Sequence, residues 1–74
     1  MKNKEIIVKV GKKVELEREK KGLSREKFAD EVGLSRMQVY RIEEGKSNPT
    51  LDTLLEICRV LDIKITELLE FNNS

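Results

Sequence analysis

Apolar residues recur along the chain with the period of an α-helix, in five short stretches separated by polar residues and glycines. The first stretch predicts a helix over about residues 4–21 that ends at Gly22. Its apolar residues follow the i, i+1, i+4, i+8 spacing of one helix face: Ile6, Ile7, Val10 and Val14. Because no stretch alternates with period 2 for long enough to form a strand, the pattern predicts an all-α fold of five helices.

Serines mark the starts of the second and third helices, and glycines mark their ends. Ser24 and Ser35 can cap these helices, and Gln38 can complete a capping box by reaching back to the Ser35 amide. Gly33 ends the second helix and Gly45 ends the third. The residues expected on their inner faces are Phe28, Ala29, Val32, Val39 and Ile42.

The last third of the chain predicts a longer fourth helix and a short fifth one. Thr50 caps a helix of roughly residues 51–61, whose apolar positions are Leu54, Leu55, Ile57, Cys58 and Leu61. A final turn or two covers about residues 65–70, and residues 71–74 are expected to form a frayed tail. The Cys58 thiol is expected to be buried and unreactive.

The second and third helices meet at Gly33 with almost no loop between them. A tight turn needs glycine where φ becomes positive, and two helices that cross at about 90–120° need a small residue where they approach most closely. Ala29 meets the second requirement. The pattern therefore predicts a helix-turn-helix, whose second helix can enter a DNA major groove.

Length and composition exclude several classes of function. A chain of 74 residues predicts a single domain over residues 1–74, with its core over about residues 6–70. With no His and one Cys, the chain cannot form a Cys/His zinc cluster, an internal disulfide or the common Ser-His-Asp and Cys-His catalytic arrangements. No apolar run approaches the roughly 18 residues of a membrane span. We therefore expect a cytoplasmic protein that is not an enzyme and has no metal, cofactor, membrane partner or small-molecule ligand.

The net charge of +1 conceals an uneven distribution. Residues 1–46 contain 13 Lys and Arg against 9 Asp and Glu, a net charge of +4, whereas residues 47–74 contain 2 against 5, a net charge of −3. Such a chain can present one basic and one acidic face. Charged residues also simply solvate small helical proteins, so charge alone leaves both interpretations open.

Residues 10–69 resemble the Cro/phage-repressor (XRE) class of lambda-repressor-like helix-turn-helix domains. The resemblance implies a five-helix DNA-binding fold, with helices 2 and 3 forming the helix-turn-helix, that works as a homodimer on an inverted-repeat operator. It rests on residues that lie at the family's spacing: Arg18, Lys21-Gly22-Leu23-Ser24, Phe28-Ala29, Val32-Gly33-Leu34-Ser35, Val39, Arg41-Ile42-Glu43, Gly45-Lys46, Asn48-Pro49-Thr50-Leu51, Leu54-Leu55 and Leu61.

The predicted third helix has an outward face with the chemistry of a DNA reader. Arg can bridge guanine O6 and N7, Gln can pair with adenine, and Met or Tyr can touch a thymine methyl group. An ordinary solvated face has a similar composition, but within a helix-turn-helix we expect contacts with bases. At about 100° per residue the candidates are Arg36, Met37, Tyr40 and Arg41, with Gln38 at the border.

The resemblance also implies contacts with the DNA backbone. It assigns phosphate contacts to Ser24 and Arg25 at the start of the second helix, and to Lys46 and Asn48 after the third. Free amides at a helix N-terminus attract anions, which supports the first pair independently.

A structural ion pair is implied between Arg18 and Glu43, which the resemblance places as partners. Glu43 falls on the inward side of its helix beside Ile42, where an unpaired carboxylate would be costly. We therefore expect this pair to hold the third helix rather than to contact DNA.

The last 12 residues are more apolar than a terminal turn needs. Some of them must cover the core, and the others are expected to form the two-fold dimer surface that the resemblance implies. The candidates are Ile63, Ile65, Leu68, Leu69 and Phe71.

Together these patterns favour a transcriptional regulator that binds specific double-stranded DNA sequences as a homodimer, of the repressor or restriction-modification controller type. The alternative is a protein-interaction module with the same fold, such as an antitoxin-like protein that binds a partner protein.

Overall fold

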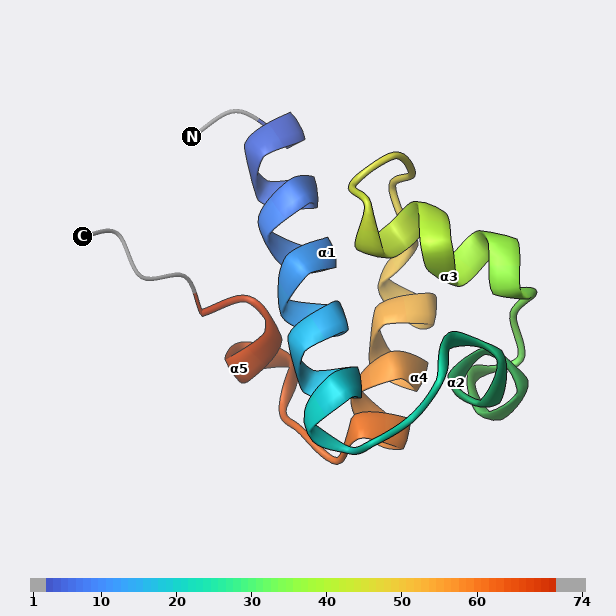
Figure 1. Cartoon of the computed structure of the whole chain (residues 1–74). Helices are drawn as coiled ribbons and strands as arrows, with labels where there is room; N and C mark the ends of the chain where they lie inside the picture. The colour runs from blue at the N-terminus through green and yellow to red at the C-terminus, as the bar shows by residue number, and fades with distance from the viewer. Residues whose placement is uncertain (1–2, 71–74) are drawn as a thin grey trace.

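The computed structural model describes residues 3–70, which form five α-helices and no strand (Figure 1). The five-helix, all-α prediction is confirmed. The first and last helices end one or two residues earlier than expected, at Lys20 and Leu68. The bounds are α1 (Asn3–Lys20), α2 (Arg25–Val32), α3 (Arg36–Glu43), α4 (Leu51–Leu61) and α5 (Ile65–Leu68).

The helix starts agree with the expected capping residues. The hydroxyls of Ser24, Ser35 and Thr50 each accept a hydrogen bond at 3.1 Å from the amide three residues further on. Oε1 of Gln38 accepts a hydrogen bond from the Ser35 amide at 2.8 Å, which completes the capping box. The start of α5 has no such cap, since its N-cap residue Lys64 supplies no side-chain hydrogen bond to the helix.

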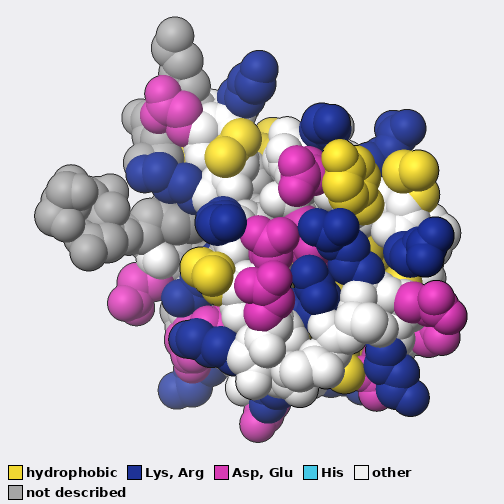
Figure 2. Space-filling view, in the orientation of Figure 1, with side chains coloured by type: hydrophobic (Ala, Val, Ile, Leu, Met, Phe, Trp, Pro, Cys, Tyr) yellow, Lys and Arg dark blue, Asp and Glu magenta, His cyan; other side chains and the backbone are white. Residues whose placement is uncertain are grey.

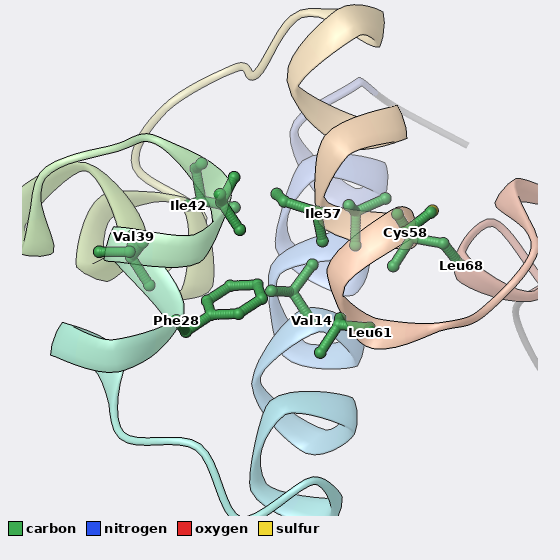
Figure 3. Packing of buried hydrophobic residues seen from close by; sticks show 11 residues of the cluster. Val14, Phe28, Val39, Ile42, Ile57, Cys58, Leu61 and Leu68 are labelled. Atoms are coloured by element: carbon green, nitrogen blue, oxygen red, sulfur yellow. The ribbon is translucent and has the colours of Figure 1, made fainter.

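The core lies where α1, α2, α3 and α4 meet, with α5 covering one end (Figure 1). The Phe28 ring points from α2 toward Val14 of α1, and Ile57 and Leu61 of α4 belong to the same cluster (Figure 3). α3 packs against both α1 and α2, so the core determines how this helix is presented to solvent. The buried hydrophobic residues are Val10, Val14, Phe28, Ala29, Val32, Val39, Ile42, Ile57, Cys58, Leu61 and Leu68.

Gly11 is buried in the middle of α1, against the C-terminal end of α3. The sequence pattern gives no reason for a glycine here, because it interrupts no apolar period and ends no helix. Its role is to let α1 and α3 lie close together. The residues that touch there are about thirty positions apart in the chain.

Within residues 3–70, no helix has the length and apolar character needed to cross a membrane. The same part of the chain contains no group of three Cys, Asp or Glu side chains that could hold a metal ion.

Candidate nucleic-acid interface

The turn between α2 and α3 has the geometry of a helix-turn-helix. Gly33 caps α2 in the left-handed conformation, with φ of 86°, as its position in the sequence predicts. The amides of Gly33 and Leu34 both donate to the carbonyl oxygen of Ala29 at 2.9 Å. Ala29 is 2% exposed, which agrees with its expected place at the closest approach of the two helices.

α3 has one buried face and one exposed face. Val39, Ile42 and Glu43 are buried, whereas the predicted base-contacting residues are all exposed. Met37 keeps 59% of its surface in contact with solvent, so its thioether is free to touch a partner. The exposed face brings together five of the predicted residues: Arg36, Met37, Gln38, Tyr40 and Arg41.

Gln38 has two competing tasks. Its Oε1 accepts the hydrogen bond from the Ser35 amide that closes the capping box. A bidentate contact with adenine needs the same oxygen as an acceptor and the amide NH2 as a donor. The NH2 group is therefore the part of Gln38 that can reach a base while the cap stays intact.

Arg18 and Glu43 form a buried ion pair between α1 and α3. Nε of Arg18 lies 2.7 Å from Oε2 of Glu43, and Nη2 lies 3.1 Å from Oε1. Nη1 donates to the carbonyl oxygen of Leu23 at 2.7 Å. The Glu43 side chain has no exposed surface and that of Arg18 has 8%, so both charges depend on partners within the protein, and not on water, for their stabilisation.

Arg25 does not extend freely into solvent, as a simple phosphate contact would. Its Nε lies 2.9 Å from Oε1 of Glu43, and its Nη2 lies 3.4 Å from Oε2 of Glu15. Its guanidinium carbon lies 5.2 Å from the centre of the Tyr40 ring. The hydrogen bond to Glu43 is the largest influence that raises the pKa of Arg25.

The other predicted phosphate contacts lie at two places beside α3. The Ser24 hydroxyl caps α2, and the loop after α3 carries Lys46 and Asn48, both exposed. Nζ of Lys46 lies 5.5 Å from the centre of the Tyr40 ring, on which Arg25 also lies. Tyr40 therefore contacts cations from both predicted phosphate-binding segments.

An open groove of about 940 Å³ runs between the C-terminal half of α1, the start of α2 and the start of α3. In the face that Figure 2 shows, acidic and basic side chains lie next to each other rather than in separate fields. The positive charge of residues 1–46 is therefore interrupted by carboxylates that lie beside α3. The groove is lined by Glu15, Arg18, Glu19, Ser24, Arg25, Glu26, Arg36, Met37 and Tyr40.

The predicted dimer surface needs a correction at Leu68, which has 0% exposure and belongs to the core. Ile63 and Ile65 are partly buried against the same core, because α5 packs against α1 and α4. Leu69 is 44% exposed and remains available to a partner. Phe71 lies outside the described residues.

Two exposed leucines of α4 were not predicted as surface residues. Leu51 is 63% exposed, and Leu55, which the pattern gave as one of the apolar positions of this helix, is 47% exposed. They lie one turn apart on the same side of the helix. The apolar stripe of α4 is wider than the core can cover, and that excess width is the signal in the sequence that could have identified them.

The helix-turn-helix family model HTH_3 matches residues 14–68. The chain belongs to this family. The match confirms the resemblance seen in the sequence, and it makes the chain a DNA-binding transcriptional regulator of the helix-turn-helix type.

Relatives and solved structures agree with this assignment. The chain is 38% identical over 65 residues to the control protein C.MunI of a Mycoplasma species, covering 86% of this chain and 88% of that protein. It is 36% identical over 57 residues to an HTH-type transcriptional regulator of Archaeoglobus fulgidus, covering 77% and 81%. The restriction-modification controller protein C.AhdI from Aeromonas hydrophila superposes with a TM-score of 0.81 and 39% identity, covering 84% of this chain and 94% of C.AhdI.

Proposed function

We propose that this HTH_3 protein binds an inverted-repeat operator in double-stranded DNA as a homodimer and regulates transcription from it, as a repressor or a restriction-modification controller. α3 enters the major groove with Arg36, Met37, Gln38, Tyr40 and Arg41 facing the bases. The segments before and after the helix-turn-helix core hold the phosphates through Ser24, Lys46 and Asn48. The protein acts by binding and needs no catalytic step, cofactor or small ligand.

The two-sided character of α3 is the observation that carries this proposal. Its inner face is held by the core and by the buried ion pair of Arg18 and Glu43. Its outer face exposes two arginines, an amide, a thioether and a phenol, which are the groups that read base edges. A helix held rigidly on one side and exposed on the other supports insertion into a groove without rearrangement of the domain.

The proposed dimer places the apolar surface away from α3. Leu69 follows α5, and Leu51 and Leu55 are two further exposed apolar residues, on α4. Similarity to the controller proteins C.MunI and C.AhdI supports the controller class of function. The net charge of −3 falls in residues 49–74, after Asn48, and it also supports a partner-facing role for this part, because it would repel the DNA backbone.

Selection from a random duplex library by the purified protein tests the proposal. We expect an inverted repeat whose two half-sites are one helical turn apart, about 10 base pairs from centre to centre. Binding is expected to weaken steeply with salt, and Lys46→Ala is expected to reduce the slope of log K against log salt by about 0.9. Lys64→Ala removes an equal charge from the other half of the chain and serves as the control.

The variant Arg36→Ala distinguishes contacts with bases from non-specific electrostatic attraction to the DNA backbone. It is expected to relax the preference at one operator position, where a lost bidentate contact is worth about 1–3 kcal/mol. If selection enriches no sequence over bulk DNA, the proposed function is wrong. Capture of a specific protein partner by a chain that does not bind DNA would then support the interaction-module alternative.

A further inference from the structure

Arg25 connects the buried network of Glu43 to the exposed ring of Tyr40. One side of its guanidinium donates to Glu43 at 2.9 Å and to Glu15 at 3.4 Å, and its carbon lies 5.2 Å from the centre of the Tyr40 ring. Resting on the proposed function, we propose that Arg25 is a positioning residue for operator specificity. It holds Tyr40 in the orientation in which α3 reads DNA, instead of contributing a phosphate contact.

The contacts of Arg25 favour this role over phosphate binding. The side chain is 33% exposed and bonds to carboxylates on two other helices, Glu15 on α1 and Glu43 on α3. Arg18 and Arg25 together face the two carboxylates of Glu15 and Glu43, so the charges of this cluster balance and the attraction of Arg25 for a phosphate is reduced. Moving it to the DNA backbone would also remove one donor from Glu43, whose side chain is fully buried.

The contacts of residue 25 suit an arginine better than a lysine. A cation within about 6 Å of a ring centre is attracted to the ring, and Tyr40 has Arg25 at 5.2 Å and Lys46 at 5.5 Å. Arginine can bond with its edge while its plane lies over a ring, whereas lysine offers a single point charge. Because Lys46 lies in an exposed loop, Arg25 is the contact that ties the ring to the core.

The first test compares Arg25→Gln and Arg25→Lys in operator selection and in salt titration. Both variants lose the planar fork, and both are expected to reduce the preference at the base pair beside Tyr40 about two- to fivefold. The slope of log K against log salt stays at the wild-type value in both. Equal weakening on all sequences, a slope lower by about 0.9 in Arg25→Gln and full rescue by Arg25→Lys would instead identify a phosphate contact and overturn the proposal.

The second test needs no DNA, because Tyr40 is the single tyrosine of a chain without tryptophan. Its fluorescence therefore reports on this ring alone. Quenching by acrylamide is expected to increase in both Arg25 variants, and to stay at the wild-type value in Lys27→Gln, which removes an exposed cation from the same turn of α2. Unchanged quenching in folded Arg25→Lys overturns the proposal, since the ring is then held by other contacts.

The two tests separate this inference from the proposed function. A wild-type protein that selects no operator refutes the proposed function and, with it, the specificity role of Arg25. A wild-type protein that selects an operator, together with Arg25 variants that select it equally well, refutes only the role of Arg25.

Discussion

Gly11 of α1 lies directly against the carbonyl oxygen of Ile42 at the end of α3. A methyl group on Gly11 would overlap that oxygen and stand 2.9 Å from the carbonyl oxygen of Glu43. These are backbone atoms, which cannot rotate away as a side chain can. The absence of a side chain at Gly11 therefore determines how closely α1 and α3 pack.

Gly11→Ala is expected to destabilise the protein by about 1–3 kcal/mol, because the two helices must separate to admit the methyl group. Helix propensity alone predicts that the same substitution stabilises the protein, since alanine in a helix interior is favoured over glycine by about 1 kcal/mol. A urea melt therefore distinguishes the two effects by the direction of the shift. A variant Gly11→Ala as stable as the wild type would show that α1 and α3 can move apart freely.

Glu43→Ala is expected to lower stability more than most substitutions. It leaves the guanidinium of Arg18, whose side chain is 8% exposed, without its carboxylate partner, and loss of one member of a buried pair costs about 3–5 kcal/mol. The measurement is the free energy of unfolding in denaturant.

The double variant Arg18→Met/Glu43→Leu provides the control for this prediction. Because it removes both buried charges, it is expected to recover part of the lost stability. If the double variant is less stable than Glu43→Ala, the cost arises from packing rather than from the unpaired charge.

The sequence predicted the helices well because the signals for their ends are local. Ser24, Ser35 and Thr50 cap helices through bonds to amides three residues away, and a reader of the sequence sees both partners at once. The turn at Gly33 is equally local, since it depends on the backbone conformation of one residue.

The sequence could not predict contacts that depend on the angle between helices. The close approach at Gly11 and the bond from Arg25 to Glu43 join residues that become neighbours only when α1, α2 and α3 pack together. Leu68 and Leu69 illustrate the same limit. They are adjacent leucines at the end of a four-residue helix, Leu68 as its last residue and Leu69 as its C-cap, and a single turn of periodicity cannot define which of the two is buried.

Acid is expected to weaken the protein partly through Glu15. The hydrogen bond from Lys12 at 3.1 Å is the main cause that lowers the Glu15 pKa below its ordinary value of 4.5. Glu15 therefore stabilises the fold above pH 4.5, and this contribution disappears as the pH falls through its lowered pKa.

Glu15→Gln should make the fold less stable at pH 7 by less than about 1 kcal/mol and reduce the further loss on acidification. Thermal melts at a series of pH values measure both effects. Lys12→Gln should remove a large part of the same pH dependence, and the double variant should add little more. Additive effects of the two substitutions would show that the pair does not interact.

Asp62→Gly is expected to stabilise the protein. Asp62 ends α4 in the left-handed conformation with φ of 56°, where a side chain is disfavoured and glycine is not. We expect a gain of about 0.5–1 kcal/mol, or a melting temperature higher by about 2–8 °C. Asp62→Ala keeps the Cβ atom and should give no gain. An equal gain in both variants would assign the effect to loss of the negative charge.

Leu69→Asp is expected to weaken the proposed homodimer without unfolding the protomer. Leu69 is 44% exposed beside the fully buried Leu68, so a charge at position 69 stays in water in the monomer and is desolvated only at an interface. We expect the dimer dissociation constant, measured by sedimentation over a range of concentrations, to rise at least about tenfold, as a penalty of about 1.4 kcal/mol requires.

Leu16→Asp is the matched control for the dimer prediction, because Leu16 is 45% exposed on α1. It should leave the dissociation constant at the wild-type value. In Leu69→Asp, binding to a full inverted repeat should fall much more than binding to a single half-site, since each protomer keeps its own α3. Equal losses on the two kinds of DNA, or a dissociation constant that does not change, would place the dimer surface away from α5.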